Sequence, residues 1–463
     1  MMRHLIVGGG PAGQCALQTI RALDRDAEIS LVCDEPAYAR MVLPYYLEGK
    51  IEERAVLTAD TDWYAEQRVA THFGSRVVAI DPGGGSVALD GGETLEFDRL
   101  LIATGSRAAR PPIPGLAGDG VVNMWTLDDA KAFLEKPRGE TVIVGAGFIA
   151  FTVLDAIVAR SEKVSFVEIE SQILPRMLDA TAAAQMAAHL EARGIAIHTG
   201  TSVDAIEDDG GRRSLRLGNG KRLLADAVVV AAGIQPNTEL VAGSGITTGA
   251  GPGAGILVDD HLQTSAANVY AAGDVAEGFD LLTGEQRVHA IQPTAVDHGR
   301  VAGANMVGSD VTYAGSLTMN ILAAQGLEAC SFGDWAGDGR EVHTALNAPN
   351  RIYRKYVFDG NKMVGGALVG PTLSVTGVND VGMLKGLVQT GVPLGPWKAY
   401  LLENPLDLRR VYVASGAAKQ LLASTLLTGS ASAGGGFRFP ALPPTRKRSK
   451  HHETLLEGKS APA

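Results

Sequence analysis

The sequence is poor in cysteine, and none of its cysteines has a spacing that suits a metal or a local redox pair. Cys15, Cys33 and Cys330 are the three cysteines in 463 residues, and no two of them form a CxxC or CxxxxC pair. Zinc sites and short redox disulfides use such spacings. We therefore expect no metal site, and we interpret the cysteines as small apolar residues in a reducing compartment.

Long apolar runs and an excess of positive charge are also missing. No window approaches the roughly 18 unbroken apolar residues of a membrane span. The first strand begins so close to Met1 that no room is left for a signal peptide. The formal net charge is −10, which argues against nucleic acid as the main partner. We expect a cytoplasmic protein without a membrane span.

Strand-like and helix-like patterns alternate over most of the chain. Apolar, β-branched runs such as RHLIV, EISLVC, RLLIATG, TVIVGAG, KVSFVE and DAVVVAAG are separated by helical or glycine-rich stretches. Alternation of this kind is typical of parallel sheets covered by helices. From Tyr313 onward the pattern changes to short alternating strands followed by helical stretches, which predicts a separate α+β domain.

The first strand runs into a glycine-rich turn that is typical of a dinucleotide site. Gly8, Gly10 and Gly13 occupy the three glycine positions of GxGxxG. They allow a tight turn, a close approach of a pyrophosphate and helix packing, while the helix N-terminus attracts phosphate charge. The next strand ends at Asp34 and Glu35, either of which could accept hydrogen bonds from a ribose. Together these features predict a bound dinucleotide.

Residues 139–170 repeat this arrangement. Gly145 and Gly147 are followed by Ala150 at the third position, and Glu168 ends the next strand. A carboxylate there accepts from both ribose hydroxyls and repels a 2′-phosphate, so this site favours NADH over NADPH. The alternative is a structural βαβ unit that binds nothing. Two sites imply two cofactors, with a flavin in the first receiving hydride from a nicotinamide in the second.

At this point the chain resembles the two-dinucleotide-binding flavoprotein reductases related to the pyridine nucleotide-disulfide oxidoreductases. The segment FDRLLIATGSRAARPPIPG is similar to the strand and crossover that leave the FAD domain, and DAVVVAAGIQPNTEL to the return crossover. NVYAAGDVAE resembles the second FAD fingerprint, whose aspartate, here Asp274, accepts from a ribitol hydroxyl. The following helix, IQPTAVDHGRVAGANM, would direct its N-terminus at the flavin.

The resemblance implies an α/β fold in which an NAD domain is inserted in an FAD domain, with both domains Rossmann-like, plus a C-terminal α+β interface domain. The expected segments are 1–110 and 237–312 for FAD, 111–236 for NAD(H), 313–428 for the interface domain and 429–463 for a disordered tail. The residues expected to bind FAD are Gly8, Gly10, Pro11, Ala12, Gly13, Asp34, Glu35, Arg40, Ala103, Thr104, Gly105, Gly273, Asp274, Thr294 and Ala295. Those expected to bind NAD are Gly145, Gly147, Phe148, Ile149, Glu168 and Gly233.

The sequence departs from the family where electrons leave the flavin. Met41, in YARMVLPYY, occupies the position of a reactive cysteine, and Met cannot form a thiolate. Tyr45 and Thr152 stand where ferredoxin and rubredoxin reductase relatives have a lysine and a glutamate that pair near the nicotinamide. Loss of both partners avoids a lone buried charge. We identify no catalytic side chain, although His289 and His298 flank the flavin-facing helix as either proton donors or structural histidines.

The leading hypothesis is an FAD-dependent NAD(P)H oxidoreductase, with NADH preferred, that passes electrons to a ferredoxin or rubredoxin type carrier. Any iron–sulfur cluster must belong to that partner, because this sequence has no cysteine pattern for one. One alternative is an NADH oxidase that forms peroxide. Another is a flavin-bearing subunit with a degenerate nicotinamide site. Homodimerisation through the third domain is an expectation from the resemblance.

Overall fold

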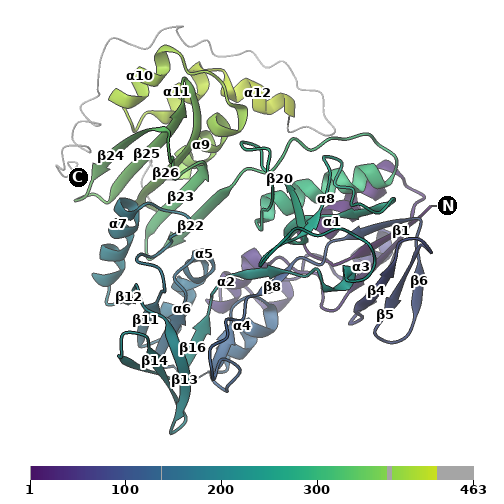
Figure 1. The fold of residues 1–463 in the computed structure, drawn as a ribbon, viewed down its shortest axis with the longest axis horizontal. Helices are drawn as coiled ribbons and strands as arrows, with labels where there is room; N and C mark the ends of the chain where they lie inside the picture. The colour runs from purple at the N-terminus through teal and green to yellow at the C-terminus, as the bar shows by residue number, and fades with distance from the viewer. Residues whose placement is uncertain (1, 137, 373–377, 425–463) are drawn as a thin grey trace. The chain divides into compact units, whose positions relative to one another are not determined.

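A computed structural model describes residues 2–136, 138–372 and 378–424 (Figure 1). The chain divides into two compact units. The first comprises Met1–Pro112, Leu116–Pro137 and Val229–Leu317, and the second comprises Ile113–Gly115, Arg138–Val228 and the chain from Thr318 onward. The α/β fold class expected from the sequence is confirmed, whereas the proposed domain limits stay a prediction. The expected tail lies outside the described residues. No helix in the described ranges is long and apolar enough to cross a membrane.

The first unit is built on a five-stranded parallel sheet of order β19-β7-β1-β2-β3. Its central strand is apolar on both faces, as expected where helices cover a parallel sheet. Leu5 and Ile6 of β1 are fully buried between the two neighbouring strands. The bounds of the strands are β1 Arg3–Val7, β2 Glu28–Cys33, β3 Val69–Phe73, β7 Arg99–Ile102 and β19 Val269–Ala271.

Smaller elements complete this unit. They include an antiparallel meander, a three-stranded sheet, and a ribbon in which β8 pairs with β17. The meander is β4 Val77–Asp81, β5 Ser86–Leu89 and β6 Thr94–Glu96; the sheet is β18 Ile256–Leu257, β20 Ala276–Phe279 and β21 Gln286–Val288; the ribbon is β8 Ser106–Ala108 and β17 Ile234–Pro236. The other elements are α1 Pro11–Leu23, η1 Arg40–Val42, α2 Leu43–Leu47, η2 Glu53–Ala55, α3 Thr61–Glu66, β9 Val121–Asn123, α4 Leu127–Leu134, η3 Glu239–Val241, η4 Gly273–Val275 and α8 Gln292–Met306.

The second unit contains a parallel set of strands and an antiparallel sheet. β10, β11 and β12 pair in parallel, and β22-β23-β26-β25-β24 form the antiparallel sheet. The strand bounds are β10 Glu140–Val144, β11 Lys163–Val167, β12 Ala196–His198, β13 Val203–Asp209, β14 Arg212–Leu217, β15 Arg222–Ala225, β16 Ala227–Val230, β22 Met319–Ala324, β23 Leu327–Gly333, β24 Glu341–Asn347, β25 Ile352–Asp359 and β26 Lys362–Pro371. The helix bounds are α5 Phe148–Thr152, α6 Leu154–Arg160, α7 Ala180–Glu191, α9 Val378–Thr390, α10 Pro396–Glu403, α11 Leu408–Ala414 and α12 Ala417–Ser424.

A polar contact joins the two parts of this second unit. Asp179 caps α7 by accepting from the Ala182 N–H, and its other carboxylate oxygen accepts from the Tyr353 hydroxyl at 2.6 Å and lies 3.1 Å from the Lys355 Nζ. Tyr353 and Lys355 belong to β25, in which every residue but the last is buried. The antiparallel sheet is therefore fastened to the N-terminus of α7 by a charged, hydrogen-bonded contact.

In the first unit, α1 and α8 pack so closely that a side chain would not fit between them at two positions. A Cβ added to Gly299 would lie 2.2 Å from the carbonyl oxygen of Ala12, and one added to Gly303 would lie 2.8 Å from that of Ala16. Both glycines are buried within α8. Helix propensity disfavours glycine here, so the close approach of the two helices explains why glycine occupies these positions.

We predict that Gly299→Ala lowers the thermal midpoint and reduces the FAD content of purified protein. The added methyl group must push α8 from α1, which costs about 1–3 kcal/mol for overpacking. Thermal unfolding and the flavin-to-protein absorbance ratio measure both effects. Gly382→Ala in α9 is the control, because a Cβ there meets no atom within 4 Å. Equal behaviour of the two variants would contradict the packing argument.

His298, on α8, is a buried structural histidine. Its Nδ1 accepts from the Gly273 N–H at 3.4 Å, so its proton is on Nε2, which faces the Ser316 hydroxyl at 3.4 Å. The ring also contacts Tyr313 edge-on, with centroids 4.9 Å apart. Burial lowers the pKa of His298 to about 3. The imidazole is therefore neutral at physiological pH and is not a ready proton donor.

We predict that His298 makes the protein lose stability in acid. Its pKa lies below the unfolded value of about 6.5, so its contribution is complete above pH 6.5 and is lost as pH falls toward 3. One extra proton bound on unfolding gives a slope of up to about 1.4 kcal/mol per pH unit. Urea unfolding of His298→Gln should show a shallower dependence between pH 7 and 5.

The control for this prediction is His261→Gln. Hydrogen bonds to Asp310 and Asp260 raise the pKa of the half-buried His261. Its contribution is therefore present below its unfolded pKa and is lost as pH rises, which is the opposite sign. Parallel pH profiles for wild type and His298→Gln would show that His298 does not titrate on unfolding.

Candidate functional site

The first glycine loop is shaped for a close approach by a ligand. Gly8 has φ +110°, and a Cβ there would lie 2.1 Å from the carbonyl oxygen of Ala103. A Cβ on Gly13 would lie 2.0 Å from the carbonyl oxygen of Gly8, so this glycine lets α1 rest against β1. At Gly10 an added Cβ meets nothing within 4 Å. The outer side of the loop is thus open, which is the fit a pyrophosphate requires.

The N-terminus of α1 faces this opening without a cap of its own. Gly10 is the N-cap residue, no side chain accepts from the first turn, and Pro11 begins the helix without an N–H. The backbone N–H groups of the first turn, including those of Ala12 and Gly13, have no partner within the helix. Together with the helix dipole they favour an anion. The predicted FAD residues therefore suit the diphosphate of a dinucleotide.

The two acids after β2 have different surroundings. Asp34 is exposed and pairs with Arg76 at 2.7 Å. Glu35 accepts from the Tyr38 hydroxyl at 2.9 Å and lies 3.7 Å from the Arg40 guanidinium. Burial raises the pKa of Glu35, and Arg40 and Tyr38 act in the opposite direction. Glu35 is therefore the acid held inside the site, and Asp34 is turned to the surface.

Arg40 connects this acid to an aromatic side chain that sequence reasoning did not select. Its guanidinium carbon lies 4.8 Å from the centroid of Trp125, which is a cation–π contact. The indole Nε1 donates to the Ser106 carbonyl at 2.6 Å. A Cβ built on Gly105, which has φ +65°, would lie 3.8 Å from the Arg40 Nη1. Arg40 is thus held where its charge can balance a phosphate.

Asp274 lies in the second FAD fingerprint and has one carboxylate oxygen to spare. Its Oδ2 accepts from the Ser106 hydroxyl at 2.6 Å, and its Oδ1 has no hydrogen-bond partner among the described residues. Burial raises the pKa of Asp274, which Ser106 and Arg40 oppose. The free Oδ1 of Asp274 can accept a hydrogen bond from a hydroxyl group of the ligand, because a carboxylate oxygen with a free lone pair is an acceptor. Ser106 lies in the crossover segment quoted above but was not among the predicted residues, and Trp125 lies outside every motif found in the sequence.

The remaining predicted FAD residues surround Asp274. Gly273 has φ +78°, and a Cβ there would lie 3.2 Å from the Cβ of Ala12 and 3.4 Å from that of Ala295. Thr294 and Ala295 are buried in the first turn of α8, whose N-cap Ile291 makes no side-chain bond. The first unit therefore brings together two segments that are far apart in the sequence.

The crossover ribbon is tied by reciprocal hydrogen bonds. The Thr104 hydroxyl donates to the Asn237 carbonyl at 3.0 Å, and the Asn237 side-chain amide donates to the Thr104 carbonyl at 2.9 Å. Gly233, predicted for the nicotinamide, has φ +107°, and its carbonyl accepts from the Ala109 N–H at 2.9 Å. The expected crossover markers thus fix the ends of β8 and β17 to one another.

The second glycine loop has the same shape in the second unit. Gly145 has φ +96°, a Cβ on Gly147 would meet nothing within 4 Å, and Ala150 is fully buried. Phe148 and Ile149, both half-buried, begin α5 directly after the open glycine. Two short helices follow the loop, because α5 ends at Thr152 and α6 begins at Leu154. Val153, with φ −105° and ψ 0°, separates them.

Glu168 is turned toward this loop. One of its carboxylate oxygens accepts from the Ala146 N–H at 2.6 Å, and the other accepts from the Glu170 N–H at 3.0 Å. The side chain is buried, yet each oxygen has a lone pair left. Two backbone donors thus fix the carboxylate beside the glycine turn, where a ribose is expected. The residues present fit an adenine dinucleotide.

Met41, Tyr45 and Thr152 stand where family members have a reactive thiol or an ion pair, and these side chains can form neither. Met41 and Tyr45 are about half exposed, and the Thr152 hydroxyl donates to the Ile149 carbonyl at 2.7 Å within its own helix. Burial raises the pKa of Cys15, and it raises those of Cys33 and Cys330 to about 12. All three thiols therefore resist forming the reactive thiolate.

One group of potential metal ligands occurs in the described part of the chain. Asp259, Asp260 and His261 lie together at the surface. The two ring nitrogens of His261 lie 2.8 Å from carboxylate oxygens of Asp260 and Asp310. These contacts satisfy the imidazole without an ion, so the group carries no metal assignment.

Comparisons with known proteins agree with this geometry. The family described as pyridine nucleotide-disulphide oxidoreductase matches residues 2–299. The chain is 32% identical to the NADH-dependent phenylglyoxylate dehydrogenase subunit epsilon of Aromatoleum evansii, over 88% of this chain and 96% of that protein. It is 33% identical to the ferredoxin–NAD(+) reductase component of the biphenyl dioxygenase system of Paraburkholderia xenovorans, over 61% of this chain and 69% of that protein.

A solved structure extends the likeness to the fold. The NAD-dependent persulfide reductase of A. fulgidus superposes with a TM-score of 0.79 and 26% identity, covering 91% of this chain and 84% of that one. These matches confirm the family, the enzyme class and the FAD and NAD(P)H cofactors expected from the sequence. The chain therefore belongs to the pyridine nucleotide-disulphide oxidoreductase family and is an FAD-dependent oxidoreductase of nicotinamide nucleotides.

Proposed function

We propose that this chain passes electrons between NADH and a separate one-electron carrier protein, of ferredoxin or rubredoxin type, by way of FAD. The observation that carries the proposal is the combination of two intact nucleotide loops with the absence of a usable thiol. Met41 replaces the cysteine, and burial raises the pKa of all three cysteines that the chain has. A thiol–disulfide route therefore has no nucleophile.

Several of the predicted residues have a role in holding the cofactors. Gly10 and the first turn of α1 receive the FAD diphosphate, and Glu35 and Asp274 accept from its hydroxyl groups. Glu168 accepts from the adenosine ribose of NADH. When bound, FAD would accept two electrons from NADH as a hydride and release them one at a time to the carrier. This role requires no side-chain acid or nucleophile, which suits a site where His298 is neutral.

Two relatives support a protein partner. The ferredoxin–NAD(+) reductase component names a ferredoxin, and the phenylglyoxylate dehydrogenase protein is one subunit of a larger enzyme. This chain has no cysteine pattern for a cluster of its own. We therefore infer that the cluster resides on a partner polypeptide, and that FAD in this chain exchanges electrons with it. Homodimerisation remains an expectation.

We predict that Glu168→Ala weakens NADH binding and erases the preference over NADPH. The variant loses the carboxylate that accepts from the ribose hydroxyls, and charge-assisted hydrogen bonds contribute about 1.5–3 kcal/mol each. The dissociation constant for NADH should rise roughly tenfold or more, while that for NADPH falls or stays equal. Glu170→Ala is the matched control, because it removes the same kind of carboxylate two residues after Glu168, and the Glu170 side chain is exposed. An unchanged ratio would support the degenerate nicotinamide site instead.

We predict that a ferredoxin or rubredoxin is reduced by NADH faster than oxygen is. Cytochrome c reduction through an added carrier protein measures the first rate, and oxygen consumption with peroxide detection measures the second. The partner route predicts a kcat/KM for the carrier at least tenfold above that for oxygen. Rapid peroxide formation with no gain from any carrier would instead assign the chain as a peroxide-forming NADH oxidase.

A further inference from the structure

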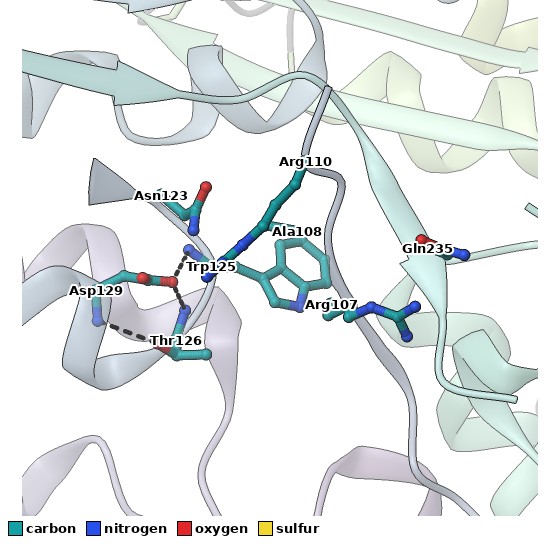
Figure 2. Close-up of a pocket in the computed structure, with 8 residues that line it drawn as sticks. All are labelled: Arg107, Ala108, Arg110, Asn123, Trp125, Thr126, Asp129 and Gln235. Carbon is teal, nitrogen blue, oxygen red and sulfur yellow. Dashed lines mark hydrogen bonds between the residues drawn. The ribbon is translucent and has the colours of Figure 1, made fainter. Parts of the chain in front are cut away.

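A pocket of about 500 Å³ opens in the first unit beside the β8–β17 ribbon (Figure 2). Its polar and aromatic lining consists of Arg107, Arg110, Asn123, Trp125 and Gln235, together with the N-terminal turn of α4. None of the residues predicted to hold FAD or NADH lines this pocket. In the view of Figure 2 the Trp125 indole lies between the amides of Asn123 and Gln235.

Two of the charged side chains in this pocket, Arg107 and Asp129, already have partners within the protein. Arg107 donates to the Asn237 side-chain oxygen at 2.9 Å and pairs with Glu239. Asp129 directs one carboxylate oxygen at the N–H groups of Trp125 and Thr126, as the dashed lines in Figure 2 show. Both of these charges are therefore committed to the protein itself.

Three polar side chains of the pocket have no such commitment. Within the described part of the chain, Arg110, Asn123 and Gln235 make no side-chain hydrogen bond or ion pair. A guanidinium group has five N–H donors in a fork that matches phosphate, and an amide offers both a donor and an acceptor. Arg110 therefore has its guanidinium free for a ligand at the exposed side of the pocket, and Asn123 and Gln235 offer two free amides.

Trp125 supplies a rigid aromatic surface. Its Nε1 is fixed on the Ser106 carbonyl, and Arg40 lies over the ring at 4.8 Å. A ring held in this way gains stacking energy without losing rotamer freedom. Bases stack on aromatic side chains with about 1–3 kcal/mol each, and pockets of roughly 300–1,000 Å³ are typical of small-molecule sites.

We propose that this pocket binds a nucleoside phosphate as a second ligand, separate from FAD and NADH. The base stacks on Trp125, the Asn123 and Gln235 amides bind its edge, and Arg110 binds the phosphate. Occupancy is coupled to the flavin through Ser106, whose carbonyl accepts from Trp125 and whose hydroxyl donates to Asp274. The coupling rests on the proposed function, because it requires FAD to be bound at Asp274, whereas binding of the nucleoside phosphate does not.

The test uses the FAD-containing full chain and AMP as the probe. With saturating NAD+ present to occupy the nicotinamide-nucleotide site, isothermal titration should give one AMP per chain, and the affinity should be roughly tenfold weaker or more in Arg110→Gln because a charged hydrogen bond is lost. Adenosine, which lacks the phosphate, should bind wild type and Arg110→Gln alike. The AMP affinity of Glu168→Ala should equal that of wild type, which separates this pocket from the NADH site. Arg110→Gln should retain wild-type flavin reduction by NADH.

Binding lost in Glu168→Ala and retained in Arg110→Gln would place AMP in the NADH site and overturn the proposal. Absence of any heat at millimolar AMP would overturn it as well. AMP should also shift the flavin absorbance of wild type but not of Arg110→Gln. Arg110-dependent binding with an unchanged flavin spectrum would support the pocket assignment and overturn the coupling to Asp274.

Discussion

The first unit depends on a backbone contact that only glycine permits. α1 carries the first FAD segment and α8 follows the second, and these segments are separated by more than half of the chain. They meet because Gly299 lets α8 approach the Ala12 carbonyl, and because Gly273 fits between Ala12 and Ala295. A Cβ at any of these points would separate the loop of Gly10 from Asp274. The close packing of α1 on α8 therefore brings the two parts of the cofactor site together, and the polar contacts of the site depend on that packing.

The charges around the site follow from this packing. Glu35 and Asp274 are drawn into a partly buried region where burial raises the pKa of each carboxyl group, and Arg40 stands near both. Arg40 is kept in place by the Trp125 ring, and Ser106 joins that ring to Asp274. A ligand that brings hydroxyl donors and a diphosphate satisfies these groups together. Neutral His298 adds no charge to the arrangement.

Much of this site could be predicted from sequence because its elements are local. A strand, a glycine turn and a helix occupy consecutive residues, so Gly8, Gly10 and Gly13 reveal their role by spacing alone. The acid at the end of β11 is similarly fixed, and Glu168 does turn toward the loop of Gly147. The sequence predicts FAD, NAD(H) and interface domains, whereas the structure divides into two compact units, so the domain limits stay a prediction.

What the sequence could not predict depends on tertiary contacts. Asp34 and Glu35 are adjacent and chemically equal, and only the positions of Arg76 and Arg40 decide which of them faces the surface. Trp125 lies in no motif, and the crossover segment that contains Ser106 does not reveal the role of that residue, because both roles arise where the crossover ribbon meets the α4 segment. The break at Val153 has no signal in the sequence, since FIAFTVLDAIVAR has an unbroken helical pattern and contains neither Gly nor Pro.

The central claim is that NADH delivers electrons to FAD in this chain without a thiol. The most direct test mixes the FAD-containing protein with NADH in the absence of oxygen and follows flavin absorbance by stopped flow, in the wild type and in a variant in which Cys15, Cys33 and Cys330 are each replaced by Ala. Hydride transfer without a thiol predicts rapid bleaching of the flavin in both samples at the same rate. A flavin that stays oxidised under excess NADH, or one that bleaches only in the wild type, would contradict this route.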